Sequence, residues 1–262
     1  FSPFTLKNVK DQLCPILARL ATVALEVGKF PVKWLESKVF FIYKKGEKSN
    51  PNNFRSISIQ NPFLKIVMSS LTKRISAYAE ENGLLPMFQF GFRKGHSTFS
   101  AATILYEAAS QRLKKKPKSE RTYICLVDFS KCFDSINREL LFIKLQCLGI
   151  PYDVCNFLFY VYTNCKLFIR TGSHLIQHFQ TMIGLPQGCS LSPILFCLFV
   201  SDLPDFLTHI GVRLGEITLK YLMFADDLAL LAATPADLQN AIDSLAAYCQ
   251  SHGLKINTEK TK

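Results

Sequence analysis

Two short hydrophobic runs near the C-terminal end of the chain, Leu219–Phe224 and Leu228–Leu231, are separated only by Ala225, Asp226 and Asp227. Apolar runs of this length are typical of buried strands, and so short a connection makes the two strands pair antiparallel. The connection contains no turn glycine, although glycine is common in tight hairpins. We therefore expect a buried hairpin that carries two adjacent carboxylates at its tip.

A third acidic residue, Asp128, stands at the end of another hydrophobic run, Tyr123–Val127. Two strands that bring carboxylates to one point provide the oxygen ligands with which proteins hold two Mg²⁺ ions for phosphoryl transfer. An isolated Asp-Asp pair between strands is more often turn chemistry, because Asp side chains hydrogen-bond to nearby backbone. The third acid favours the metal interpretation, and a nucleotide polymerase is the first hypothesis to test.

The net charge of +11 is unevenly distributed along the chain. Residues 1–120 contain 20 Lys and Arg against 8 Asp and Glu, whereas residues 121–262 contain 11 against 12. Basic residues bind polyanions largely by releasing condensed counterions, although excess charge is also typical of a solvated surface. We expect a polyanionic partner that is held mainly by the first half of the chain.

Bulk features narrow the class of protein further. A chain of 262 residues can bury a sizeable core, as one large domain or two closely packed subdomains. Its nine cysteines form no Cys-x-x-Cys pair, which favours a reducing, intracellular compartment and argues against zinc. The most hydrophobic stretch, Ile194–Val200, is far shorter than the roughly 20 residues that span a bilayer, so we expect a buried helix and no membrane partner. The chain starts with Phe1 and stops after Lys262, and we expect it to be an excerpt of something longer.

Periodicity and end signals predict an α+β fold, with a sheet backed by helices. The last predicted helix has the clearest ends, with Thr234 as N-cap, Pro235 in the first turn and Gly253 past the end. Other predicted helices are at Phe1–Val27, Asn61–Glu81, Asn137–Leu148, Asp153–Tyr162 and Ile194–Val200, and further strands at Val39–Tyr43, Arg55–Ile59, Lys166–Arg170 and Leu175–Met182.

Three motifs follow one another in a distinctive order. Residues 127–134 read Val-Asp-Phe-Ser-Lys-Cys-Phe-Asp, residues 184–193 read Gly-Leu-Pro-Gln-Gly-Cys-Ser-Leu-Ser-Pro, and residues 224–227 read Phe-Ala-Asp-Asp. With these motifs the chain resembles a reverse transcriptase, most closely those of non-LTR (LINE-like) retrotransposons, from about Val39 to Lys262. The resemblance implies a right-hand polymerase fold with fingers at 1–120 and palm at 121–262, the thumb being absent.

The resemblance also implies a reaction and its metal ligands. The chain is expected to be an RNA-directed DNA polymerase that adds dNTPs to the 3′-hydroxyl of a DNA primer on an RNA template. Two Mg²⁺ ions, with Mn²⁺ as a possible substitute, are expected on Asp128 and Asp226, with Asp227 as a third and less direct ligand. The backbone carbonyl of Phe129 is expected to coordinate metal as well.

Phe133 lies five residues beyond Asp128. Elsewhere in the chain such a ring would be read as a core aromatic, but by similarity it occupies the steric-gate position that excludes the 2′-hydroxyl of an rNTP. Asp134, the next residue, leaves open the pattern in which viral RNA polymerases use a second acid to read that hydroxyl. The aromatic ring and the Pro-Gln-Gly loop favour a dNTP-using enzyme.

Four further residues are predicted to bind the nucleotide. In the loop at 184–193, Gly188 permits close backbone approach and Gln187 offers an amide for hydrogen bonds, although a loop that merely precedes a helix is the simpler interpretation. Lys44 and Arg55 resemble the residues that hold the triphosphate in that family. Arg suits this role because its planar guanidinium binds phosphate oxygens in pairs. The family more often has Pro where Tyr43 and Ser56 stand, which affects only local rigidity.

The loop that contains Gln89 and Arg93 resembles the template-side loop that precedes the palm, so both residues are predicted to bind template. Lys260 fits the position of a lysine proposed to protonate pyrophosphate, although a lysine so close to the end of a sequence is ordinarily solvated surface.

The family resemblance predicts a nuclear location, together with a thumb and, in many relatives, an endonuclease that this sequence does not contain. Two alternatives stay open. A group II intron-type reverse transcriptase or an RNA-dependent RNA polymerase would share the three acids. An inactive or domesticated copy would bind nucleic acid without catalysis, and lost acids would be its expected sign.

Overall fold

The computed structural model describes residues 7–114, 121–171, 174–175, 178–208 and 211–262. The chain divides into two compact units, each built from two separate stretches. Unit 1 contains Phe1–Ile75 and Arg138–Ser192, and unit 2 contains Ser76–Asn137 and Pro193–Lys262. The packing therefore does not follow a single boundary near residue 120, and the expected bounds of fingers and palm stay a prediction.

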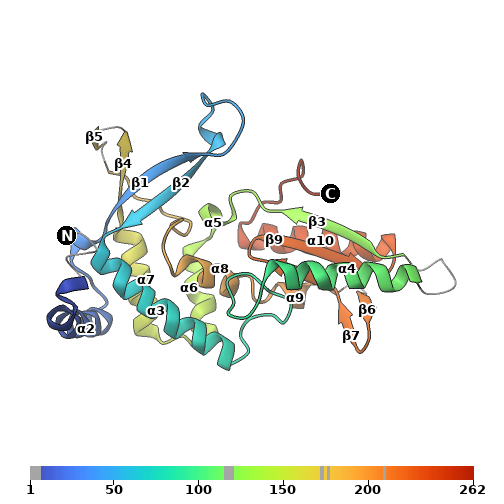
Figure 1. Cartoon of the computed structure of the whole chain (residues 1–262), viewed down its shortest axis with the longest axis horizontal. Coiled ribbons are helices and arrows are strands. Elements are labelled where there is room, and N and C mark those ends of the chain that lie inside the picture. The colour runs from blue at the N-terminus through green and yellow to red at the C-terminus, as the bar shows by residue number, and fades with distance from the viewer. Residues whose placement is uncertain (1–6, 115–120, 172–173, 176–177, 209–210) are drawn as a thin grey trace. The chain divides into compact units, whose positions relative to one another are not determined.

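Unit 1 is organised around a four-stranded sheet in the order β2-β1-β4-β5 (Figure 1). The strands predicted at 39–43 and 55–59 are both present and form a hairpin, in which β1 (Glu36–Tyr43) pairs antiparallel with β2 (Phe54–Gln60). β1 also pairs in parallel with β4 (Lys166–Thr171), which in turn meets β5 (His174–Leu175). Part of the strand predicted at Leu175–Met182 lies outside the described residues.

In the part of the chain that the structure describes, four helices contribute to unit 1. They are α2 (Lys10–Val27), α6 (Arg138–Cys147), α7 (Tyr152–Asn164) and α3 (Pro62–Glu81), and α3 supplies residues to both units. α7 packs against α2 and α6. The start of α3 follows the sequence prediction, since the Asn61 side chain accepts a hydrogen bond from the Phe63 N–H at 3.0 Å. One apolar face of α3 is buried, formed by Leu64, Val67, Met68, Leu71 and Ile75. Short 3₁₀ turns occupy Val32–Trp34 and Pro51–Asn53.

Unit 2 contains an antiparallel sheet in the order β3-β9-β8. Its strands are β3 (Tyr123–Asp128), β9 (Asp227–Ala232) and β8 (Tyr221–Phe224). The hydrophobic run predicted as one strand is divided near Lys220, because its first part belongs to a separate hairpin. That hairpin joins β6 (Val212–Leu214) to β7 (Ile217–Leu219), and sequence periodicity did not predict the pair.

Two long helices pack on this sheet. α4 (Thr98–Lys114) packs against β8 and β6, and α10 (Pro235–His252) packs against β9 and β3. Ala108 of α4 shares a hydrophobic cluster with Leu222, Ala229 and Leu231. Because successive side chains of a strand point to opposite faces, Asp128 and Asp227 lie on the face that α4 partly covers.

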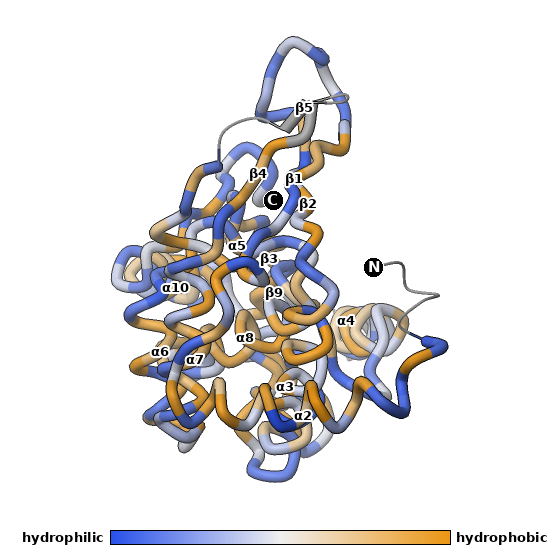
Figure 2. The backbone as a smooth tube through the Cα atoms, turned by 90° about the vertical axis from the view of Figure 1, so that its left-hand side faces the viewer, coloured by the Kyte–Doolittle hydropathy of each residue, from blue (hydrophilic) through white to orange (hydrophobic). Residues whose placement is uncertain are grey.

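Shorter helices complete unit 2, namely α5 (Cys132–Ser135), α8 (Ser192–Phe199) and α9 (Leu203–Phe206). Hydrophobic residues predominate along α8 (Figure 2), and Ile194–Phe199 are all buried. The prediction of a short buried helix there is confirmed. Among the described residues, no helix combines the length and apolar character needed to cross a membrane.

The ends of α10 match their sequence signals. The Thr234 hydroxyl accepts a hydrogen bond from the Asp237 N–H at 3.1 Å, so one of the unpaired N–H groups of the first turn is satisfied. Gly253 ends the helix in the left-handed conformation at φ 70°. Only glycine adopts that conformation without a steric cost from Cβ.

We predict that Thr234→Ala lowers the free energy of unfolding by about 1 kcal/mol, because the cap is lost. The melting temperature should fall by about 2 °C. Thermal unfolding measured by circular dichroism tests this, with Thr258→Ala at an exposed position as the matched control. An equal shift in both variants would contradict the cap's contribution.

Candidate active site

The pairing of β3 with β9 brings the predicted acids together. Asp128 lies directly opposite Asp227 in the antiparallel register, and Asp226 is the preceding residue of the hairpin turn. Phe224 pairs with Asp227 on the other side, so Ala225 and Asp226 form the whole connection between β8 and β9. Ala225 adopts the left-handed conformation at φ 58°, which lets the chain reverse without a turn glycine.

Two of the carboxylates accept hydrogen bonds from side chains distant in sequence. Asp128 Oδ2 accepts from Asn257 Nδ2 at 3.1 Å and from Lys260 Nζ at 3.2 Å. Asp226 Oδ2 accepts from the Cys132 thiol at 3.3 Å. The structure therefore places Lys260 beside Asp128, and its role as a general acid stays a prediction.

The electrostatics of the turn favour a bound cation. The pKa of Asp227 is raised above its ordinary value, first by partial burial and then by the negative charges of Asp226 and Asp128. Both effects penalise an ionised carboxylate. A divalent cation would offset both, so this part of the chain has the charge that a metal site requires.

The donor set also fits Mg²⁺, which prefers hard oxygen ligands. Phe129 pairs with Ile256 in a bridge whose hydrogen bonds are made by its two neighbours, which directs its own carbonyl away from that bridge. Among the residues that the structure describes, no group of three or more His, Cys, Asp or Glu side chains is gathered closely enough to hold a metal ion. The backbone brings the acids together, while the side chains of Asp128 and Asp226 are turned toward Lys260, Asn257 and Cys132.

A cavity of about 410 Å³ lies against the same strand ends. Asp128, Asp227 and Lys260 form its polar side, and residues of α4, β3, β8 and β9 form the rest. Ala101, Ala102 and Leu105 are the α4 residues that line it. A phosphate or sugar group beside the acids would therefore meet both the carboxylates and a mainly apolar wall.

Phe133 lies on α5, within the same unit as the acids. Its ring stacks on Phe196 of α8 with 4.9 Å between centroids, and the Phe92 ring approaches at 6.4 Å in an edge geometry. The preceding Lys131 has a left-handed φ of 48° and begins α5. These contacts fix the orientation of the half-buried Phe133 ring. A residue that limits the space beside a nucleotide sugar would need a fixed orientation.

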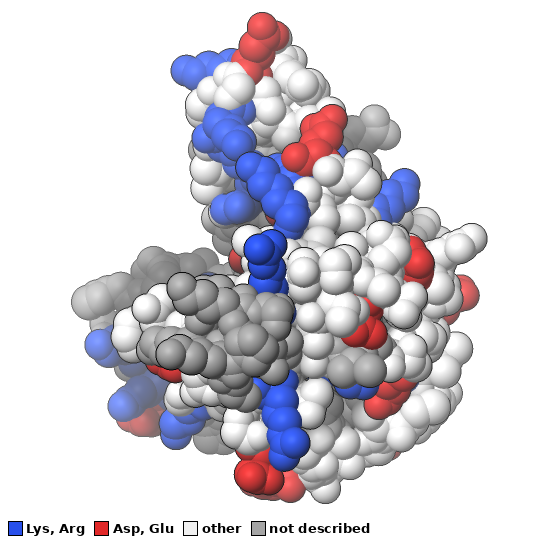
Figure 3. Space-filling view, turned by 90° about the vertical axis from the view of Figure 1, so that its right-hand side faces the viewer, with Lys and Arg blue, Asp and Glu red and all other residues white. Residues whose placement is uncertain are grey.

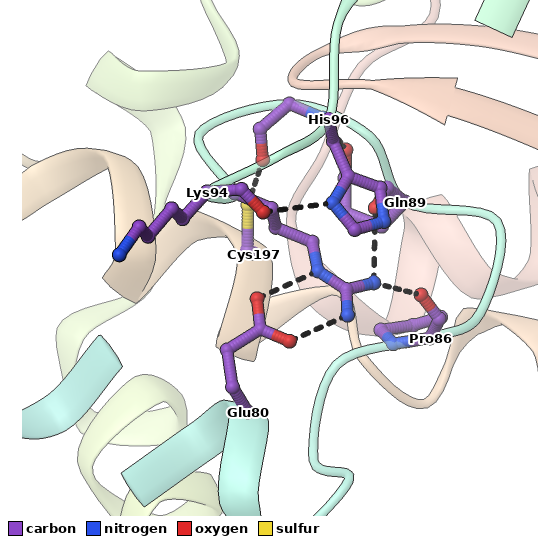
Figure 4. A network of polar contacts seen from close by, with 8 residues as sticks. Glu80, Pro86, Gln89, Lys94, His96 and Cys197 are labelled. Carbon is purple, nitrogen blue, oxygen red and sulfur yellow. Dashed lines mark hydrogen bonds and ion pairs between the residues drawn. The ribbon is translucent and has the colours of Figure 1, made fainter. Parts of the chain in front are cut away.

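Gln89 and Arg93, which are predicted to bind template, both bond to groups within unit 2. Gln89 is fully buried, with its amide bonded to Ala225 and Gly91. The Arg93 guanidinium binds both oxygens of Glu80, at 2.8 and 2.6 Å (Figure 4), and its hydrogen bond lowers the pKa of that carboxyl. Both side chains make internal hydrogen bonds that organise this loop, and template binding by them stays a prediction.

Unit 1 contains the other predicted nucleotide-binding residues. Lys44 and Arg55 are both exposed and lie near the end of the β1–β2 hairpin. Lys and Arg side chains follow one another along this hairpin, which is at the top of Figure 3. The Ser58 N–H donates to the Gln187 carbonyl at 2.6 Å, so the loop at 184–193 lies against β2. Gly188 has a φ of 112°, and a Cβ there would overlap the Ser58 carbonyl, which explains the glycine.

Residue-by-residue reading missed several parts of the site. Buried Arg138 donates to the carbonyls of Gly184 and Tyr162, at 2.8 and 2.9 Å, and so fixes the start of the loop at 184–193. Asn257 and Cys132, which bond to the acids, were not selected either. Cys132 lies inside the motif at 127–134, which was the one available signal, whereas Arg138 and Asn257 lie outside the three motifs.

Comparison with known proteins gives one family. The family model described as "Reverse transcriptase (RNA-dependent DNA polymerase)" matches residues 42–262. The chain is 28% identical over 265 residues to the "Probable RNA-directed DNA polymerase from transposon BS" of Drosophila melanogaster, covering 98% of this chain and 28% of that protein. It is 30% identical over 234 residues to the "Retrovirus-related Pol polyprotein from type-1 retrotransposable element R2" of Nasonia vitripennis, covering 89% and 22%. The chain thus spans about a quarter of the curated relatives it matches.

Solved structures support the same fold. A telomerase structure from Candida tropicalis with a fragment of telomeric RNA matches with a TM-score of 0.64 and 15% identity, covering 87% of this chain and 41% of that one. A second telomerase structure from that organism, truncated at its C-terminal domain, matches with a TM-score of 0.63 and 18% identity, covering 88% and 50%. The predicted right-hand polymerase fold is therefore confirmed.

We predict that Asp227→Asn raises the melting temperature at neutral pH in the absence of divalent metal. A raised carboxyl pKa contributes stability below the ordinary Asp value of 3.8, and this contribution is lost as the pH rises through the raised value. The advantage of Asn over Asp should therefore grow between pH 4 and pH 7, to about 2 °C for a partly exposed group. Adding Mg²⁺ should reduce it.

Thermal melts at several pH values measure this difference. Asp243→Asn, on the exposed side of α10, is the matched control, and an advantage that does not change with pH would show that charge repulsion is not its cause.

Proposed function

The chain belongs to the reverse transcriptase (RNA-dependent DNA polymerase) family, and from that premise we propose that it copies an RNA template into DNA for a non-LTR retroelement. Its substrates would be dNTPs, an RNA template and a DNA primer. The main support in the structure is the register that sets Asp128 opposite Asp227, with Asp226 beside them. Three carboxylates on adjacent strand ends are what nucleotidyl transfer to a 3′-hydroxyl needs.

In the proposed reaction the primer 3′-oxygen forms a bond to the α-phosphorus, and the bond to the departing pyrophosphate breaks. Asp128, Asp226 and Asp227, with the carbonyl of Phe129, would hold two Mg²⁺ ions, for which Mn²⁺ is a possible substitute. Bound there, the ions would lower the pKa of the hydroxyl and neutralise the leaving group. To bind them, Asp128 and Asp226 exchange their present side-chain hydrogen bonds for metal.

Lys260 is proposed to act as general acid. Its ammonium lies 3.2 Å from Asp128 Oδ2, so the proton that it would donate to a pyrophosphate oxygen is already beside the reacting groups. The exposure of its side chain leaves it able to turn from the carboxylate to the leaving group. General acid catalysis requires that the donor reach the leaving group within hydrogen-bonding distance, and this mobility supports the proposal.

The triphosphate is proposed to be held by unit 1. Lys44 and Arg55 supply exposed cationic groups on the β1–β2 hairpin, and charge-assisted bonds to phosphate are strong. Gln187 and Gly188 would contact the nucleotide from the loop that rests on β2. The packing of that loop against Ser58 supports a shared role for hairpin and loop.

In the longer protein, a thumb and an endonuclease domain are expected partners of this chain, and the expected nuclear location stays a prediction. Template contact is proposed for the outer side of the loop that follows Gln89. Its exposed Phe92 and Lys94 offer a ring and a charge to nucleic acid, in addition to the predicted template residues Gln89 and Arg93.

We predict that Asp226→Asn lowers the rate of dNTP addition to an RNA-templated DNA primer by about a thousandfold or more, as expected when an essential group is removed. The substitution keeps the shape of the side chain and removes its charge. Asp243→Asn should leave the rate unchanged. Primer extension at saturating Mg²⁺ measures both, and activity retained in Asp226→Asn would exclude the assigned role.

We also predict that Phe133→Val increases incorporation of rNTPs relative to dNTPs by about tenfold or more, because the smaller side chain leaves space for the 2′-hydroxyl. The readout is the ratio of kcat/KM for dNTP to that for rNTP. Phe159→Val on α7 is the matched control. An unchanged ratio would show that the ring does not limit space at the sugar, and would reopen the RNA polymerase alternative.

A further inference from the structure

The segment around Gln89 lies along the outer edge of β8. The Phe90 N–H donates to the Met223 carbonyl and the Met223 N–H donates to the Phe88 carbonyl, both at 2.8 Å. These bonds form a short parallel bridge between Gln89 and Met223. The bridge places the Gln89 side chain beside the turn that follows Met223, within unit 2.

The Gln89 amide makes three hydrogen bonds to backbone groups. Its Oε1 accepts from the Ala225 N–H at 3.1 Å and from the Gly91 N–H at 2.8 Å. Its Nε2 donates to the Ala225 carbonyl at 3.3 Å. The side chain thus binds both polar backbone groups of the one residue that precedes Asp226 and Asp227.

Ala225 is the residue whose conformation needs such support. At φ 58° it lies in the left-handed region, which is unfavourable for any residue with a Cβ. Two hydrogen bonds from one rigid amide oppose its return to an ordinary conformation. A change in φ at Ala225 would swing Asp226 relative to Asp128, so the amide sets the spacing of the acids.

The surrounding loop holds the amide in place. A Cβ at Gly91 would overlap the backbone nitrogen of Ala225, so the loop and the turn are packed as closely as backbones allow. Arg93 binds Glu80 and the carbonyls of Pro86 and Gln89, the latter two at 3.0 and 3.1 Å (Figure 4). The thiol of Cys197, a residue of α8, donates a hydrogen bond to the Gly91 carbonyl at 3.6 Å.

We propose that Gln89 is a positioning residue that holds Ala225 left-handed and thereby aligns Asp226 and Asp227 with Asp128. The effect that this proposal predicts on the catalytic rate rests on the proposed function. The effect that it predicts on the conformation of the turn at Ala225 does not. The absence of exposed surface on Gln89 and the use of both ends of its amide distinguish this role from contact with a substrate.

The first experiment measures the turn directly. Gln89→Met keeps the length of the side chain and removes all three bonds. In protein labelled with ¹⁵N-alanine, hydrogen exchange of the Ala225 amide should become at least about tenfold faster. The Ala229 and Ala232 amides of β9 serve as internal references, and Gln239→Met, at an exposed position of α10, is the matched control. Equal acceleration at Ala225 and Ala229 would overturn the proposal, because it would report general destabilisation.

The second experiment tests rescue. In primer extension, Gln89→Met should lower kcat by about tenfold to a hundredfold with KM for dNTP nearly unchanged, since misplaced acids slow chemistry more than binding. Adding Ala225→Gly should recover about fivefold or more, because glycine occupies the left-handed region without strain. An equal proportional effect of Ala225→Gly with and without Gln89 would contradict the proposal.

Two outcomes separate this inference from the proposed function. If the longer protein that includes the expected thumb does not extend primers, while Gln89→Met still exposes the Ala225 amide, the reaction is wrongly assigned and the role of Gln89 stands. If Gln89→Met does not fold, the proposal requires that adding Ala225→Gly restores cooperative unfolding, and a failure to restore it counts against the proposal.

Discussion

The pairing of β3 with β9 is the constraint on which the site depends, because it forces like charges together. The free energy gained by burying apolar side chains is larger than the free energy lost to charge repulsion. Each fully buried Leu contributes roughly 1.5–3 kcal/mol, and β9 alone buries Leu228, Leu230 and Leu231. Repulsion between charges at partly exposed positions costs about 1 kcal/mol. Hydrophobic packing therefore decides the register, and the carboxylates at the strand ends are held where they repel one another.

The two edges of this sheet are closed by segments that also serve the site. Along β3, Leu126 exchanges hydrogen bonds with Lys262 at 2.7 and 3.0 Å, so the C-terminal segment carries Asn257 and Lys260 to Asp128. Along β8, the Gln89 segment forms the parallel bridge and brings its amide to Ala225. Open sheet edges are prone to unwanted pairing, and here both edges are covered by residues that orient the acids.

Local signals in the sequence were sufficient for features that depend on neighbouring residues. The Thr234 cap, the Gly253 terminator and the hairpin at Asp226 each follow from a few adjacent residues, and the resemblance placed Asp128 with that hairpin. The burial of Gln89 could not be predicted in the same way, because its partner Ala225 is 136 residues away. The bond from Cys132 to Asp226 spans 94 residues.

The division between β7 and β8 and the division into two units were not predicted, because the local hydrophobic pattern is the same for more than one arrangement of the segments. The apolar residues of β7 and β8 are continuous in sequence, so periodicity merged two strands that belong to different sheets. The division into two units is equally non-local, since each unit joins stretches separated by more than 50 residues. Only tertiary packing distinguishes these arrangements from the simpler order of one domain after another.

Backbone strain in the described residues is concentrated around the site. Besides glycines, three of these residues have positive φ, namely Phe92, Lys131 and Ala225. Phe92 contacts the Phe133 ring, Lys131 begins the helix that carries that ring, and Ala225 precedes Asp226. Left-handed conformations cost roughly 1–2 kcal/mol each for residues with a Cβ, so the surrounding packing must impose them. The backbone that carries the Phe133 ring and the acids is set in this way by packing alone. Under the proposed function, binding energy would then need to reorient only the side chains of Asp128 and Asp226.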